Sequence, residues 1–216
     1  LLMKKILLLV TFSICSKYGN AQSPQTPQTV QAPCVEANII ILNDMSSSLT
    51  GNEDNGFFLI QSFYFGLPIA QDQVWLGLAT FGDTCRIYLR PTGSSEEVST
   101  HLNDLFQQKA NESSTNLGIE LLMMPYYFTD AAVRRGKVVR NILVIISDGY
   151  FSSSSATVTY ANILKEEYGI EIFTILYHST LYNDTYINQI VSDRTHCAFD
   201  DPDPALKIIN ARSMCQ

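Results

Sequence analysis

The chain has 216 residues, of which 46% are apolar and 16% charged, and its formal net charge is −7. This acidic balance, with no basic run along the chain, excludes the electrostatic footprint that a nucleic-acid partner needs. After the N-terminal segment, no apolar stretch reaches the roughly 18 residues of a membrane-spanning helix, so no transmembrane anchor is expected.

The N-terminal segment has the pattern of a secretory signal peptide over residues 1–21. A short stretch with two lysines at residues 3–5 precedes an apolar run over residues 6–15. Gly19 and Ala21 then place small residues at both positions that determine cleavage. Cleavage after Ala21 leaves 195 residues with 11 basic and 21 acidic side chains, a net charge of −10. We therefore expect a secreted, extracellular protein.

Residues 22–33 read QSPQTPQTVQAP and contain three prolines but almost no large apolar side chain. Such a segment cannot bury a core, so it is predicted to be an extended linker. The remaining residues, 34–216, are enough for one globular domain.

Apolar runs alternate with segments of helical period through this domain. Four runs are rich in β-branched residues and apolar on both faces, as in strands buried between two helix layers. They cover residues 37–43, 74–81, 141–147 and 170–177. A more alternating run at residues 85–89 follows a Gly-Asp turn and indicates an antiparallel edge strand.

Capping signals mark several helices between the strands. Ser94 and Glu97 have the spacing of a capping box, and Gly169 is placed to end a helix over residues 156–168. Residues 57–65 are apolar on nearly every side and predict a largely buried helix.

The last helix is predicted to open at Asp203 and Pro204, a cap followed by a proline in the first turn. The alternation of strands and helices predicts an α/β fold. We expect a doubly wound, mostly parallel six-stranded sheet with one antiparallel edge strand and helices on both faces.

An Asp-x-Ser-x-Ser motif begins where the first predicted strand ends. Alternate residues of a loop leaving a strand can face the same way, so Asp44, Ser46 and Ser48 can direct three oxygens at one point. Asp148 ends a second buried run, and Thr115 stands at the start of a predicted helix. Parallel strands place their carboxyl ends on one edge of the sheet, where the ligands of doubly wound folds collect.

Two carboxylates and three hydroxyls form an all-oxygen set that suits a hard divalent cation. Mg²⁺ is the predicted ion, and the same oxygens admit Mn²⁺ or Ca²⁺. Only two of the five groups are charged, so a bound cation would accept a further carboxylate from outside. Taken singly, each motif also fits a helix cap or a turn. The ordered combination is what favours a metal site.

These motifs resemble those of the von Willebrand factor type A domain, also called the integrin I-like domain. The resemblance extends over about residues 35–214 and rests on residues 39–48, 77–81, 115–121 and 144–149. It implies the strand order 3-2-1-4-5-6 and a metal-ion-dependent adhesion site. The implied metal ligands are Asp44, Ser46, Ser48, Thr115 and Asp148. Ser47 stands where the family commonly has glycine, which leaves the ligand spacing intact but stiffens the loop.

Four cysteines remain after signal cleavage, in an oxidising compartment. In the strand order implied by the resemblance, Cys85 and Cys197 lie on opposite sheet edges, roughly 24 Å apart, too far for a disulfide. Cys34 and Cys215 both fall at the end of the domain opposite the metal, and we favour their pairing. Cys197 competes with Cys34 for Cys215, and a cysteine left over could link two copies of the chain.

Two glycosylation sequons, at Asn111 and Asn183, fall in predicted loops toward the metal-bearing edge. One hypothesis is that a glycan on Asn111, four residues before Thr115, restricts access to the metal. The alternative is that both sequons serve secretion alone.

The motifs favour a secreted adhesion module that binds an acidic group of an extracellular protein through a divalent cation. The alternative is a structural or assembly domain that interacts through its surface independently of metal. The chain is not expected to be an enzyme, because the Gly-x-Ser-x-Gly, His-Glu-x-x-His and phosphate-loop motifs are all missing from the sequence.

Overall fold

The computed structural model describes residues 36–110, 112–113, 117–151, 154–177 and 184–211. The predicted signal peptide and linker lie outside these residues, as do Cys34 and Cys215. The strands are β1 (Ala37–Asp44), β2 (Val74–Phe81), β3 (Arg86–Thr92), β4 (Arg140–Ser147), β5 (Ile170–Leu176) and β6 (Cys197–Phe199). The helices are α1 (Glu53–Gly66), α2 (Ser95–Phe106), α3 (Leu117–Arg135), α4 (Ser154–Glu166), α5 (Asp184–Ile190) and α6 (Asp203–Ala211).

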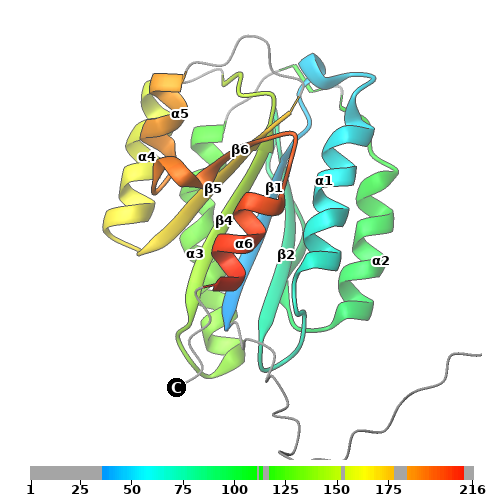
Figure 1. Cartoon of the computed structure of the whole chain (residues 1–216), viewed down its shortest axis with the longest axis vertical. Coiled ribbons are helices and arrows are strands. Elements are labelled where there is room, and N and C mark those ends of the chain that lie inside the picture. The colour runs from blue at the N-terminus through cyan, green and yellow to red at the C-terminus, as the bar shows by residue number, and fades with distance from the viewer. Residues whose placement is uncertain (1–35, 111, 114–116, 152–153, 178–183, 212–216) are drawn as a thin grey trace, which may run out of the picture. The chain divides into compact units, whose positions relative to one another are not determined.

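The six strands form one sheet with the order β3-β2-β1-β4-β5-β6 (Figure 1). Only the β2–β3 pair is antiparallel, and the other four pairs are parallel. The predicted fold class and the implied strand order are therefore confirmed. β1 and β4 are neighbours at the centre of the sheet, so the residues that follow them emerge side by side.

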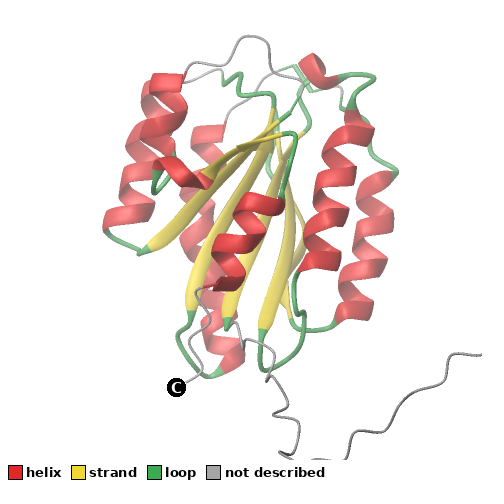
Figure 2. Cartoon of the chain, in the orientation of Figure 1, coloured by secondary structure: helices red, strands yellow, loops and turns green. Residues whose placement is uncertain are grey.

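Helices cover both faces of the sheet (Figure 2). Side chains alternate between the two faces along β1, as the pleat of a strand requires. Ile39 and Ile41 pack in a core with buried residues of α1, α2 and α6. Ile40 and Leu42 pack in a second core with buried residues of α3 and α4. Because both faces are covered, every residue of β1 is buried, which explains the continuous apolar run from Ile39 to Leu42 at its centre.

Helix α1 is less buried than its sequence predicts. Phe57, Ile60 and Phe63 face the core, but Phe58 and Phe65 are 64% and 74% exposed. The helix lies on the outside of one layer, so only the side toward the sheet finds apolar neighbours. The prediction of a largely buried helix at residues 57–65 is therefore wrong for its outer side.

The helix caps are close to those expected. Ser94 Oγ accepts a hydrogen bond of 3.2 Å from the amide of Glu97 at the start of α2. The Glu97 carboxylate does not reciprocate but accepts from the Thr92 hydroxyl at 2.7 Å. Helix α6 begins at Asp203, whose amide donates to the Asp201 carboxylate at 2.9 Å.

Cys85 immediately precedes β3 and Cys197 begins β6, at opposite edges of the sheet. The structure shows no disulfide between them. The predicted bridge between Cys34 and Cys215 involves residues outside the described part of the chain. Among the helices described, none combines the length and apolar character that crossing a bilayer requires.

Candidate metal centre

The predicted metal site lies where β1 and β4 end. Asp44 is the last residue of β1, and Ser147 is the last residue of β4, just before Asp148. The two strands run parallel in register, with Asn43 opposite Ile146. The Ser147 hydroxyl donates a hydrogen bond of 2.6 Å to Oδ2 of Asp44. The ends of the two strands are therefore joined by a direct side-chain contact.

Asp44 is fully buried and its carboxylate is held at both oxygens. Oδ1 accepts from the amide of Ser46 at 2.9 Å, while Oδ2 accepts from Ser147. Burial raises the pKa of Asp44 from its usual 3.8 to about 7, although these hydrogen bonds oppose the rise. The charge of Asp148 raises the pKa further, so the two carboxylates repel one another. A cation shared between them would remove that repulsion.

The two serine hydroxyls of the motif also converge. Ser46 Oγ and Ser48 Oγ lie 2.9 Å apart, within hydrogen-bond distance. Ser46 is 3% exposed, whereas Ser48 lies at the surface, so the pair extends from the buried carboxylate toward solvent. Asp148 is half-buried, and its Oδ1 accepts from the amide of Tyr150 at 3.0 Å.

Four of the five predicted ligands are therefore described, and they gather at one edge of the sheet. Thr115 lies outside the described residues, two positions before the first residue of α3. Within the described ranges, no group of three or more His, Cys, Asp or Glu side chains could hold a metal. Two carboxylates with serine hydroxyls do fit a hard divalent cation, since such ions take oxygen ligands and keep several waters. Asp44, Ser46, Ser48 and Asp148 would hold it.

Ser147 is a site residue that sequence reasoning missed. It is fully buried, bonds Asp44, and also accepts from the amide of Gly149 at 3.0 Å. Its one sequence signal is a hydroxyl at the end of an otherwise apolar run, directly before Asp148. Ser147 bonds the Asp44 carboxylate directly, and outer contacts of this kind orient metal ligands.

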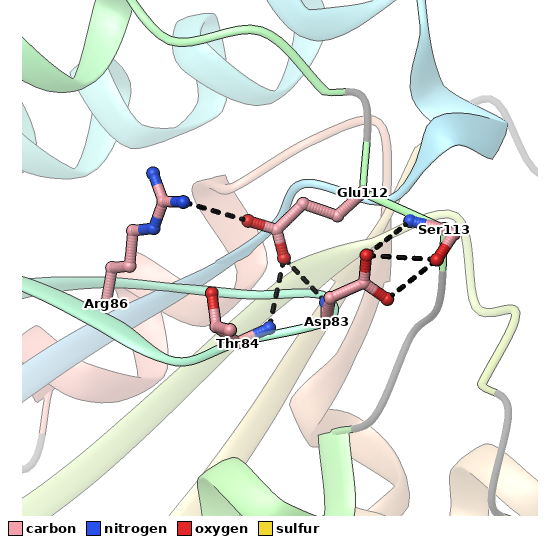
Figure 3. A network of polar contacts seen from close by, with 5 residues as sticks. All are labelled: Asp83, Thr84, Arg86, Glu112 and Ser113. Carbon is pink, nitrogen blue, oxygen red and sulfur yellow. Dashed lines mark hydrogen bonds and ion pairs between the residues drawn. The ribbon is translucent and has the colours of Figure 1, made fainter.

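Glu112 bonds both the metal loop and the turn between β2 and β3, and Figure 3 shows its contacts with the turn. One of its carboxylate oxygens accepts from the amides of Asp83 at 2.5 Å and Thr84 at 3.2 Å. Its own amide donates to the Met45 carbonyl at 3.1 Å, and its carbonyl accepts from the Ser47 amide at 2.7 Å. The Asp-x-Ser-x-Ser loop is thus paired along its backbone with residue 112.

Ser113 forms the second part of this network, which Figure 3 also shows. Its amide donates to the Asp83 carboxylate at 2.9 Å, and its hydroxyl donates to the same group at 2.9 and 3.0 Å. Ser113, the last described residue before Thr115, is therefore bonded to the β2–β3 turn. The predicted glycosylation sites, Asn111 and Asn183, lie outside the described residues.

The sequence model of the von Willebrand factor type A domain matches residues 38–212 of this chain. No curated protein sequence matches it significantly.

Several solved structures share the fold at low sequence identity. The manganese-loaded TRAP protein of Plasmodium vivax is 14% identical, with a TM-score of 0.70, and the match covers 84% of this chain and 75% of TRAP. Proximal thread matrix protein 1 of the mussel byssus, with a zinc-occupied MIDAS motif, is 16% identical, with a TM-score of 0.59 and coverage of 82% and 45%.

The pilus adhesin SpaC of Lactobacillus rhamnosus GG is 13% identical, with a TM-score of 0.65 and coverage of 85% of this chain and 30% of SpaC. This chain therefore spans less than half of the mussel protein and of the adhesin. At these identities the similarity shows a shared fold.

Proposed function

Because this chain belongs to the von Willebrand factor type A domain family, we propose that it is a secreted, metal-dependent adhesion or recognition module and not an enzyme. Asp44, Ser46, Ser48 and Asp148, completed by Thr115, would hold a divalent cation, most suitably Mg²⁺. The bound cation supplies a Lewis-acidic position that accepts a carboxylate from an extracellular protein partner. The chain's own residues fix where that position lies and how much charge surrounds it.

The observation that carries this proposal is the pairing of Asp44 with the end of β4. Asp44 is fully buried, yet among the described residues no basic side chain bonds its carboxylate; its donors include the Ser46 amide and the Ser147 hydroxyl. A buried carboxylate without a cationic partner is costly, and Asp148 adds repulsion to that cost. A divalent cation at the end of the sheet would balance both charges.

The similar solved structures support metal-dependent recognition by analogy. The TRAP structure is manganese-loaded, zinc occupies the MIDAS motif of the mussel protein, and SpaC is a pilus adhesin. A fold shared with such proteins is consistent with recognition through a metal, although fold by itself does not set function.

Titration of the protein with MgCl₂ by calorimetry, followed by NMR titration of the loaded protein with an aspartate peptide, tests this function. The peptide is acetyl-Gly-Gly-Asp-Gly-Gly-amide, which offers a single carboxylate. We expect Asp44→Ala and EDTA each to abolish peptide binding, while Asp72→Ala, an acidic residue in the turn before β2, leaves it unchanged. Peptide binding that survives both treatments would refute the role of the metal.

A metal-independent assembly domain is the second candidate, and exposed apolar side chains favour it. Phe65 of α1 and Val133 of α3 are 74% and 75% exposed, on opposite layers of the fold. This candidate predicts self-association that persists in EDTA. Size-exclusion chromatography of the purified protein in EDTA distinguishes this candidate from the adhesion module. Repeating it with and without reductant shows whether a disulfide between two copies contributes to the association.

A further inference from the structure

A polar cavity of about 230 Å³ opens beside the metal loop, at the edge of the sheet where β2 meets β3. Its lining includes Met45 of the metal loop, Thr80 of β2, Tyr88 of β3, and the charged Arg86, Lys109 and Glu112. None of the residues lining this cavity is a predicted metal ligand.

The cavity is fixed at a short distance from the metal ligands by the backbone. Met45 stands between the ligands Asp44 and Ser46 in the chain. Its amide donates to the Phe81 carbonyl at 2.9 Å, and its carbonyl accepts from the Glu112 amide at 3.1 Å. Met45 therefore belongs both to the metal loop and to the wall of the cavity, so the cavity adjoins that loop.

The charges in the cavity are arranged to receive an anion. The Glu112 carboxylate is already engaged by two backbone amides, and its ion pair with Arg86 is long, at 3.9 Å (Figure 3). The Arg86 side chain is 58% exposed, which leaves most of its donors facing solvent. Lys109 is exposed, and within the part of the chain that the structure describes it forms no ion pair. Arg86 and Lys109 thus place two positive charges at the cavity against one carboxylate, one oxygen of which already accepts from two backbone amides.

A second cavity, on the other side of the metal loop, carries the opposite charge. Its volume is about 310 Å³, and it is lined by Asn55, Phe58, Leu59, Tyr177 and Asp200. Asp200 is the only charged residue of this lining, so the cavity disfavours an anion. An acidic ligand that binds the cation would therefore extend toward Arg86 and Lys109.

We propose that the cavity at Arg86 and Lys109 is a second carboxylate subsite, which selects partners carrying two acidic side chains close together in sequence. One carboxylate binds the cation, and the other pairs with Arg86 and Lys109. This inference rests on the proposed metal-dependent function and names the class of partner that function serves. It also explains how an acidic domain recognises an acidic ligand, because the basic groups are concentrated at the point of contact.

The test uses the magnesium-loaded protein and peptides in which a variable residue X stands one to four positions after a single aspartate in a glycine background. A mirrored set places X before the aspartate. X is Glu, Gln or Lys. At one or more spacings we expect the Glu peptide to bind about threefold to tenfold more tightly than its Gln counterpart, as two partly exposed ion pairs allow.

The variant Arg86→Gln with Lys109→Gln should reduce that ratio to one while still binding Mg²⁺. Arg194→Gln with Lys207→Gln makes the same change in net charge at exposed residues away from the cavity and should retain the ratio. A ratio that persists in the first variant, or that equals one in the wild-type protein at every spacing, would overturn the subsite while leaving the metal-dependent function intact. If no peptide binds in a magnesium-dependent way, the proposed function fails and this inference fails with it.

Discussion

The hydroxyl of Ser147 donates a hydrogen bond of 2.6 Å to Oδ2 of Asp44, across 103 positions of sequence. The bond connects the carboxyl ends of β4 and β1 at the centre of the sheet. It fixes one oxygen of Asp44 while the Ser46 amide fixes the other at 2.9 Å. The orientation of the buried carboxylate is therefore set by protein groups before any cation arrives.

Ser147→Ala should weaken the binding of Mg²⁺ by about tenfold, because outer contacts of this kind orient the ligands that touch the metal. The mutation also leaves the buried carboxylate with one donor fewer, which raises its affinity for a proton. Calorimetric titration with MgCl₂ at pH 7 measures the effect. Ser62→Ala removes a hydroxyl that bonds within α1 and is the matched control, with unchanged affinity expected. Equal affinities for the two variants would show that Ser147 does not position Asp44.

The metal-free protein should lose stability as the pH rises from 4 to 7. Burial raises the pKa of Asp44 to about 7 in the folded state, against a usual value of 3.8, so the folded state holds a proton that the unfolded state has released. The unfolding free energy falls across that interval by at most about 4 kcal/mol for this group. Burial also raises the pKa of Glu120, which acts in the same direction. Urea unfolding in EDTA at pH 5, 6, 7 and 8 measures the trend.

Asp44→Asn is the control that isolates this group from general charge repulsion in an acidic chain. The variant should show a flatter dependence of unfolding free energy on pH than the wild-type protein. Mg²⁺ should stabilise the wild-type protein more at pH 8 than at pH 5, because the cation binds the deprotonated carboxylate. Parallel pH profiles for the two metal-free proteins would contradict the assignment.

The strands at the centre of the sheet were predictable because their sequences carry a strong local signal. The apolar runs that form β1 and β4 are continuous since both faces of the sheet are covered, and the polar residue that follows each run marks its end. The shared edge of Asp44 and Asp148 then follows from parallel pairing. The half-exposed character of α1 was not predictable, because Phe58 and Phe57 look alike until the direction of the helix is known.

The contacts that support the metal site could not be predicted from the sequence either. Glu112 and Asp83 are 29 positions apart, and nothing in either segment shows that their backbones and side chains meet. Their pairing depends on where the β2–β3 turn ends and on where residues 112 and 113 lie beside the metal loop. Such long-range polar contacts between loops have no periodicity to reveal them.

Glu112→Ala should loosen this network and weaken the cation site. The Asp83 and Thr84 amides would lose their common acceptor, at a cost of about 1 to 3 kcal/mol in unfolding free energy. Hydrogen exchange at Asp83, Thr84 and Ser47 should accelerate, since Ser47 bonds the backbone of residue 112. Glu167→Ala, an exposed residue just after α4, should change neither quantity. Unchanged exchange at all three amides would show that Glu112 does not hold the loops together.

Gly56→Ala should destabilise the fold and weaken the binding of Mg²⁺, because α1 passes close to the ends of β1 and β5. A Cβ at Gly56 would lie 2.9 Å from the Tyr177 hydroxyl and 3.1 Å from Asn43 Oδ1, both on buried side chains. Alanine favours a helix by about 1 kcal/mol over glycine, but the contact forces α1, and with it the metal loop that precedes it, away from the sheet. We expect a net loss of roughly 1 to 2 kcal/mol.

Gly66→Ala is the matched control at the other end of α1. Its Cβ would lie 2.7 Å from Cδ1 of Leu206, a buried side chain of α6, so this variant should also lose stability. It lies at the end of α1 away from the metal loop, so its affinity for Mg²⁺ should stay unchanged. Urea unfolding and calorimetric titration with MgCl₂ of both variants measure the changes in stability and in magnesium affinity. If Gly56→Ala binds Mg²⁺ as tightly as Gly66→Ala and the wild-type protein do, the closeness of α1 to Tyr177 does not constrain the metal loop.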